Sequence, residues 1–209
     1  MPLPRLLKDL FKRPRVDGPE ELEAFWQARA AFIAQKCVIE YCRARAGLNW
    51  QRLFSEPLFQ RAVHEASWRA WRVTLLDVAE MLDATFRPHV PVPDAMHDWL
   101  REAGGRIIAR QRREMPDTLG PAFAEATHAR VEALLETLRA RPPLPVKDIA
   151  RQRAREVFDA IPIHPDLKAP DEDYVTNTLR VFLVRACDDL KTRAEVPFLA
   201  RRVVGVSKR

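Results

Sequence analysis

The stretch that decides the fold is residues 57–86, which read PLFQRAVHEASWRAWRVTLLDVAEMLDATF. Large side chains recur there every three or four positions, at His64, Trp68, Trp71, Leu75, Val78, Leu82 and Phe86. That spacing is the period of one face of an α-helix. Pro57 is a residue favoured in the first turn of a helix, and no glycine or further proline interrupts the stretch. The pattern therefore predicts a long amphipathic helix with two tryptophans on its buried face.

The opposite face of this predicted helix carries charged side chains. These are Glu65, Arg69, Arg72, Glu80 and Asp83, with Leu76 among them. The alternation of the two faces predicts a polar surface opposite the buried stripe.

Helical periodicity also appears in the stretches 20–46, 94–114, 122–141, 146–161 and 171–190. Gly47 follows the first of them in the position that glycine favours at a helix end. Gly104 and Gly105 lie in the middle of another, which implies either a closely crossing helix or a bend. No Asn-Gly or Asp-Gly pair lies between alternating apolar residues, as a hairpin would require. We therefore expect an all-α fold, an irregular bundle of six to seven helices with no sheet.

Charge divides the chain into three parts. Residues 1–15 hold five basic residues and one acidic residue, and residues 191–209 hold six and one, whereas the whole chain has a net charge of only +6. The sequence therefore predicts a basic N-terminal segment, a slightly acidic bundle over residues 16–190 and a basic tail over residues 191–209. Three prolines between residues 142 and 145 mark a predicted subdomain break.

The N-terminal segment is amphipathic, because leucines and basic residues alternate in it. A secretory signal needs an unbroken apolar stretch, and Lys8 and Asp9 interrupt this one. Contact with an anionic membrane surface is one interpretation, and docking on the protein's own body is the other. The candidate contact residues are Leu6, Leu7, Lys8, Leu10, Phe11, Lys12 and Arg13.

The chain contains no sequence motif that is typical of a catalytic or cofactor-binding site. Its three cysteines read as reduced thiols of a cytoplasmic protein, and no stretch is long and apolar enough to span a bilayer. Two carboxylate-x-x-His pairs, Asp94 with His97 and Glu125 with His128, resemble half-sites of a di-iron bundle. Their predicted positions on antiparallel helices lie about ten residues apart, or about 15 Å, too far for shared ligation. We expect no metal, no cofactor and no catalytic residue.

Three functions stay open at this point. The first is a non-enzymatic adaptor that acts through helix-face protein contacts and touches the membrane through its basic ends. The second, from another class, is a bundle or enzyme that binds an apolar ligand in a tryptophan-lined core, with His64, Trp68 and Trp71 as the candidate pocket. The third is nucleic-acid binding through the basic tail and an arginine cluster at Arg106, Arg110, Arg112 and Arg113. The sequence shows no helix-turn-helix with a basic recognition helix, so this function is the least favoured.

Overall fold

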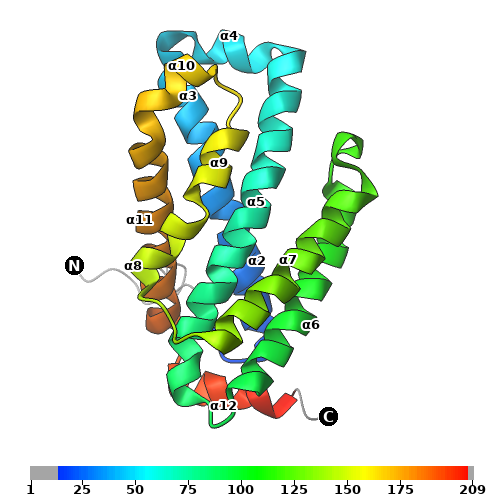
Figure 1. The fold of residues 1–209 in the computed structure, drawn as a ribbon, viewed down its shortest axis with the longest axis vertical. Coiled ribbons are helices and arrows are strands. Elements are labelled where there is room, and N and C mark those ends of the chain that lie inside the picture. The colour runs from blue at the N-terminus through cyan, green and yellow to red at the C-terminus, as the bar shows by residue number, and fades with distance from the viewer. Residues whose placement is uncertain (1–13, 207–209) are drawn as a thin grey trace, which may run out of the picture.

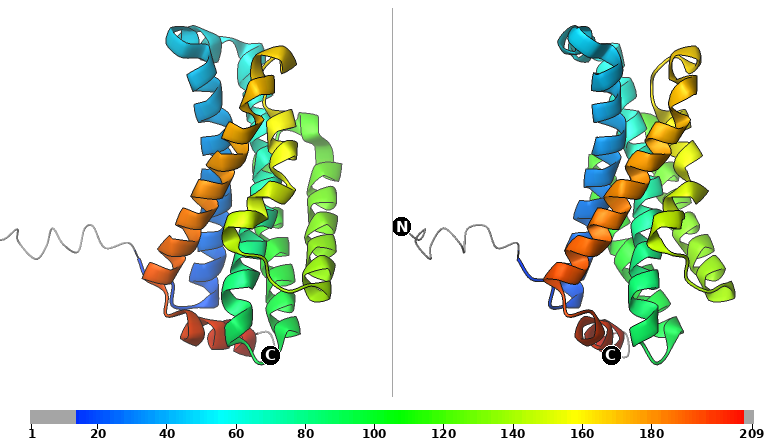
Figure 2. Two further views of the ribbon diagram at one scale, coloured as in Figure 1. Left: turned by 60° about the vertical axis from the view of Figure 1, so that its left-hand side comes forward. Right: turned by 90° about the vertical axis from the view of Figure 1, so that its left-hand side faces the viewer.

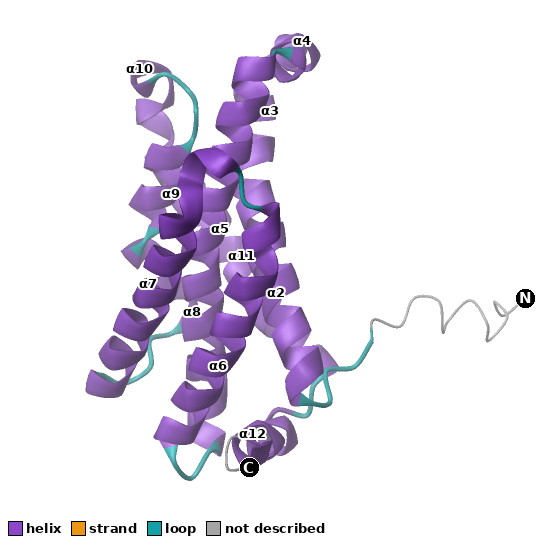
Figure 3. Cartoon of the chain, turned by 90° about the vertical axis from the view of Figure 1, so that its right-hand side faces the viewer, coloured by secondary structure: helices purple, strands orange, loops and turns teal. Residues whose placement is uncertain are grey.

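The computed structural model describes residues 14–206, and these residues form an all-α bundle (Figure 1). The helices are α2 (Pro19–Gln35), α3 (Tyr41–Ala46), α4 (Trp50–Ser55), α5 (Pro57–Phe86), α6 (Pro93–Gln111), α7 (Gly120–Ala140), α8 (Val146–Ile149), α9 (Ala154–Ala160), α10 (Pro165–Lys168), α11 (Glu172–Arg193) and α12 (Val196–Val206). No strand occurs among the described residues, as Figure 3 shows. The predicted all-α bundle without a sheet is confirmed.

The predicted organising helix is present with the expected bounds, as α5. It is the axis of the bundle, and α2, α7, α9 and α11 pack around it (Figures 1 and 2). The predicted buried stripe is buried from Trp71 to Phe86, whereas His64 is exposed and Trp68 is half-buried.

The prediction of a polar face along the whole of α5 is wrong for its second half. Every side chain from residue 73 to residue 83 is buried, including Glu80 and Asp83. The reason is that α9, α11 and the α6–α7 hairpin cover the sides that α2 leaves free. Glu80 and Asp83 are therefore held by basic partners, and those of Glu80 lie just beyond the ends of other helices, at Arg141 after α7 and Arg153 before α9.

Gly104 marks a close helix crossing, one of the two alternatives that the sequence left open. A Cβ atom on Gly104 would lie 3.1 Å from Cη2 of Trp26 on α2 and 3.4 Å from Val131 on α7. Trp26 is itself fully buried, and its Nε1 donates to the carbonyl of Leu75, 2.9 Å away. The missing side chain thus lets α6 approach the indole that links α2 to α5.

The stretch predicted as one helix over 20–46 runs from α2 through a π-helical segment, Lys36–Glu40, into α3. It ends at Gly47 with a φ of 55°, in the left-handed region that favours glycine. The stretch predicted as a helix over 146–161 is divided instead, because a 3₁₀ turn at Ala150–Gln152 separates α8 from α9.

The segment expected as a basic tail contains the end of α11 and the whole of α12. Helix α12 packs across one end of the bundle, against α2, α5 and α6 (Figure 3). The backbone N–H of Val16 donates to the carbonyl of Arg193, 3.0 Å away, which joins the two ends of the described chain. None of the described helices is both long and apolar enough to cross a membrane.

Candidate functional site

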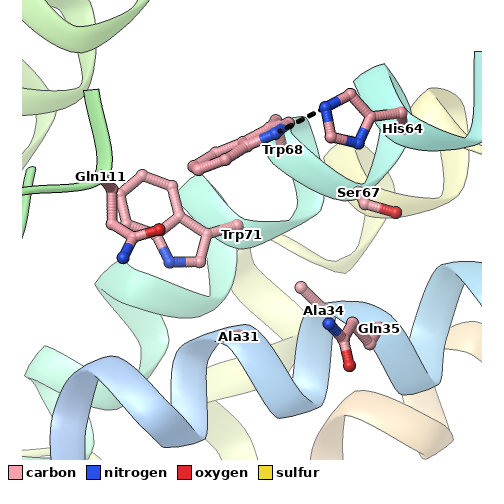
Figure 4. A pocket seen from close by; sticks show the side chains of 8 residues that line it. All are labelled: Ala31, Ala34, Gln35, His64, Ser67, Trp68, Trp71 and Gln111. Atoms are coloured by element: carbon pink, nitrogen blue, oxygen red, sulfur yellow. Dashed lines mark hydrogen bonds between the residues drawn. The ribbon is translucent and has the colours of Figure 1, made fainter. Parts of the chain in front are cut away.

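A cleft opens between α2 and α5, in the fork where the α6–α7 hairpin leans away from α5 (Figure 1). Its volume is about 190 Å³. It brings together the three predicted pocket residues His64, Trp68 and Trp71 with Ala31, Ala34, Gln35, Ser67 and Gln111 (Figure 4). Helix α5 supplies the aromatic wall, α2 supplies the floor and α6 supplies its last residue.

The aromatic wall follows from the spacing of α5, because residues three or four positions apart lie one above another on a helix. The rings of Trp68 and Trp71 are 5.3 Å apart between centroids and inclined at 72°. The rings of His64 and Trp68 are 6.4 Å apart at 85°. Edge-to-face pairs of this kind stabilise one another, so the wall holds its shape without a ligand.

The floor is made of small side chains. Ala31 and Ala34 lie three positions apart on α2 and face the aromatic wall (Figure 4). Larger residues at these two positions would fill the space beside Trp71. The cleft therefore exists because two alanines stand opposite two tryptophans.

One hydrogen bond favours one tautomer of the cleft histidine. Nε1 of Trp68 donates to Nε2 of His64, 3.3 Å away (Figure 4). Since Nε2 accepts, the proton of the neutral ring is on Nδ1, which is left as a second donor.

Trp71 differs from the buried Trp26 in the hydrogen bonding of its indole nitrogen. Its Nε1 is shielded from water and has no hydrogen-bond partner within the described part of the chain, whereas Nε1 of Trp26 is bonded. The side chain of Gln111 lies beside the Trp71 ring (Figure 4). A buried donor without an acceptor costs about 1–3 kcal/mol, so an acceptor that reached this nitrogen would be favoured.

Two exposed arginines, Arg112 and Arg113, follow Gln111 directly. The other two members of the predicted arginine cluster are engaged elsewhere. Arg106 and Arg110 both bind the carboxylate of Glu23, at 2.7 and 2.6 Å. The four arginines therefore do not form one free basic surface.

A second group of side chains that could serve in a functional site, the carboxylates of α5 and their basic partners, is buried. Arg153 lies 2.6 Å from Asp77 and 2.5 Å from Glu80, and Arg141 lies 2.6 Å from the other oxygen of Glu80. Asp83 continues the line and binds Arg87 and His97, whose Nε2 is 3.0 Å away. Each carboxylate thus has a basic partner from outside its own turn, an arrangement expected of a structural ion network.

Burial raises the pKa of Asp77 to about 7, although the nearby Arg153 opposes the shift. A shallow depression beside the network is lined by Arg130, Arg141 and Arg153. These arginines are bound by Glu156, Glu80 and Asp77, so the depression offers no free cation for a substrate.

The remaining reactive residue types are held apart from the cleft. Burial raises the pKa of the Cys42 thiol to about 12 and that of Cys37 still further, which disfavours the nucleophilic thiolate. His97 turns to Asp83, whereas Gly105 lies against His128. Within residues 14–206 no three histidine, cysteine or carboxylate side chains lie close enough to hold a metal ion.

The N-terminal candidates for membrane contact, Leu6, Leu7, Lys8, Leu10, Phe11, Lys12 and Arg13, lie outside the described residues. Sequence reasoning missed the residues of the cleft that are not aromatic, chiefly Ala31, Ala34 and Gln111. The pair of alanines on α2 was the available signal, because small residues three apart leave room at a helix contact.

Comparison of the chain with protein-family models, with curated proteins and with solved structures finds no match.

Proposed function

We propose that this protein is a non-enzymatic adaptor that holds a partner protein at the cleft between α2 and α5. The observation that carries the proposal is an open, preformed cleft, walled by Trp68 and Trp71, with the volume of a side chain or two.

Size and openness favour a protein partner over a small ligand. Enclosed ligand pockets have volumes of about 300–1,000 Å³, and this cleft is smaller, at about 190 Å³, and open to solvent. Protein interfaces concentrate their binding energy in a few anchors that fill small pockets, and tryptophan is enriched among the residues that form them. The cleft suits one apolar anchor of a partner.

The two other functions have less support. A ligand in the core would need space beside residues such as Trp26, Leu75 and Met96, which are fully buried and closely packed. Nucleic-acid binding would need a continuous basic surface, and Glu23 neutralises part of the arginine cluster. Contact of residues 1–15 with an anionic membrane remains a separate prediction, which co-sedimentation of the full chain and of a chain lacking these residues with anionic vesicles would test.

Site-specific photo-crosslinking tests the adaptor function. A photoreactive amino acid at Gln35, which lies at the cleft and is exposed, should crosslink to a specific protein in a lysate of the source cells. The matched control carries the same amino acid at Asn177, exposed on α11. A second control combines the Gln35 position with Trp68→Ala, which removes half of the aromatic wall.

The adaptor function predicts a product that forms from Gln35, is absent from Asn177 and is lost in the Trp68→Ala variant, with helicity unchanged by circular dichroism. Identical products from both positions, or no product from the cleft, would contradict it.

A further inference from the structure

The two most exposed large apolar side chains of the described residues lie at one corner of the bundle. Leu48, just before α4, has a relative exposure of 101%, and Leu58, in the first turn of α5, has one of 74%. Helix α4 joins them across the end of the bundle that lies opposite α12 (Figure 1). Leaving two leucines in water costs free energy, so this corner gains stability from any apolar phase that covers them.

The corner keeps its shape through its other apolar residues. The rings of Trp50 and Phe54 lie 6.2 Å apart between centroids, and those of Phe54 and Phe59 lie 5.3 Å apart. The side-chain amide of Gln60 donates to the carbonyl of Phe54, 2.7 Å away. These contacts fasten α4 to α5, so the two leucines are presented on a fixed frame.

The same segment carries unpaired cations. Arg52 is exposed on α4, Arg61 is exposed near the start of α5, and Arg43 stacks over the ring of Trp50, 4.2 Å from its centroid. None of the three arginines pairs with a carboxylate of the described chain. Exposed leucines among unpaired arginines are complementary to a layer of anionic headgroups over an apolar interior.

The charge balance differs between this corner and its neighbour at the same end. Residues 43–61 contain four arginines and one carboxylate, Glu56, and Arg45 alone of the arginines is bound to a carboxylate outside the segment. On the neighbouring α10, the exposed Leu167 directly follows the exposed Asp166. The electrostatic field therefore favours an anionic surface at the first of these two places.

We propose that residues 43–61, the α4 corner, dock the protein on the surface of an anionic lipid bilayer, with Leu48 and Leu58 at the boundary of headgroups and acyl chains and Arg52 and Arg61 on the phosphates. A rigid protein partner would need a separate hollow for each leucine, whereas lipids close around a side chain that protrudes. The position of α4 at the extreme end of the bundle lets it meet a flat surface without obstruction by the other helices (Figure 1).

This surface is separate from the predicted N-terminal contact and from the cleft. The N–H of Val16, near the start of the described chain, donates to the carbonyl of Arg193, which is followed by α12 at the opposite end of the bundle. Vesicle binding of the whole protein would not tell the two ends apart, so the measurement must report from the corner itself.

The probe is the fluorophore nitrobenzoxadiazole, which brightens on entering an apolar phase, attached to Asn49→Cys in the full-length protein. Asn49 is exposed beside Leu48, and its side chain makes no hydrogen bond to the end of α4. The three native cysteines are buried, so labelling is directed to the new one. The matched control carries the label at Asn177→Cys, exposed on α11.

The labelled proteins are titrated with vesicles of phosphatidylglycerol and phosphatidylcholine in equal parts, and with vesicles of phosphatidylcholine alone. We expect the emission of the Asn49 label to rise and to move to shorter wavelength with the anionic vesicles, and to respond less to the neutral ones. Added salt should weaken the response to the anionic vesicles. The Asn177 label should stay unchanged.

Variants titrated through the Asn49 label measure the two kinds of contact. Leu48→Ser with Leu58→Ser should weaken binding about a hundredfold, because burying one leucine side chain contributes about tenfold or more. Arg52→Gln with Arg61→Gln should weaken it about twentyfold, since each cation at an anionic surface contributes about fivefold. Leu167→Ser is the matched control and should change binding little. All five side chains are exposed, and circular dichroism checks that helicity is kept.

Two results would overturn the inference. One is an Asn49 label that does not respond to anionic vesicles, even where the protein sediments with them, because the contact would then belong to another part of the chain. The other is equal binding of the native protein and the double serine variant. If the protein then self-associates through the two leucines, as shown by loss of that association in the double serine variant, the corner is covered by a second copy instead.

Discussion

Arg153→Met is the sharpest test of the buried ion network on α5. Arg153 bridges Asp77 and Glu80, at 2.6 and 2.5 Å, and its own side chain is only 12% exposed. Methionine would keep most of the aliphatic volume and remove both ion pairs. Glu80 would retain Arg141, whereas Asp77 would be left buried without a cation.

The expected loss can be worked from these contacts. Removing one partner of a buried ion pair costs about 3–5 kcal/mol, because the remaining group must either stay charged out of water or take up a proton. Since one of the two carboxylates keeps a partner, we expect about 3 kcal/mol, at the lower end of that range. For a chain of this size such a loss lowers the melting temperature by about 6–12 °C.

Urea denaturation followed by tryptophan fluorescence and by circular dichroism measures this loss. The matched control is Arg155→Met, two residues further along in α9, whose side chain is 63% exposed and pairs with Asp159 and Glu172. The control should leave the unfolding midpoint almost unchanged. A loss below about 1 kcal/mol in Arg153→Met, or one equal to the control, would refute the reasoning that the network is dry and tightly coupled.

Three further predictions concern other buried groups. The pKa of Asp77 is raised to about 7 in the folded state from 3.8. Between these two pH values the folded state keeps a proton on Asp77 that the unfolded state has released, so the free energy of unfolding should fall as pH rises towards 7. Asp77→Asn should lose this dependence, and its free energy of unfolding relative to the native protein should increase from pH 5 to pH 8. Gly104→Leu should lower the free energy of unfolding by about 1–3 kcal/mol through overpacking. Gly105→Ala, whose Cβ would meet nothing closer than 3.6 Å, should leave it unchanged or raise it by up to about 1 kcal/mol through helix propensity. Urea denaturation compares the two variants. Cys37 and Cys42 should resist Ellman's reagent in the folded protein at pH 8 and react once guanidinium unfolds it, and fast labelling without denaturant would contradict their burial.

The sequence predicted those parts of the fold that depend on local spacing. The bounds of α5, the end of a helix at Gly47 and the all-α class follow from periodicity and from the conformational preferences of single residues. The close crossing at Gly104 was one of two alternatives, because a glycine shows that something approaches and does not show which side chain it is. The structure identifies that side chain as Trp26.

The burial of Glu80 and Asp83 could not be predicted from the α5 sequence. Periodicity assigns a charged residue to a polar face, and only its distant partners make burial tolerable. Arg141 and Arg153 lie 61 and 73 positions from Glu80 in the chain. The cleft was predictable in part, since the spacing placed His64, Trp68 and Trp71 on one face, whereas the facing alanines belong to another helix.

The order of the ion partners along the chain has a consequence for synthesis on the ribosome. The carboxylates of α5 emerge first, and their cations follow one by one, at Arg87, then at Arg141, and last at Arg153. Until the last of these has left the exit tunnel, closing the bundle around α5 would enclose at least one carboxylate without its cation. The nascent chain can thus pair α2 with α5 early, but completion of the fold is deferred until well over three quarters of the chain has been translated. This delay places the protein among those that nascent-chain chaperones have time to meet.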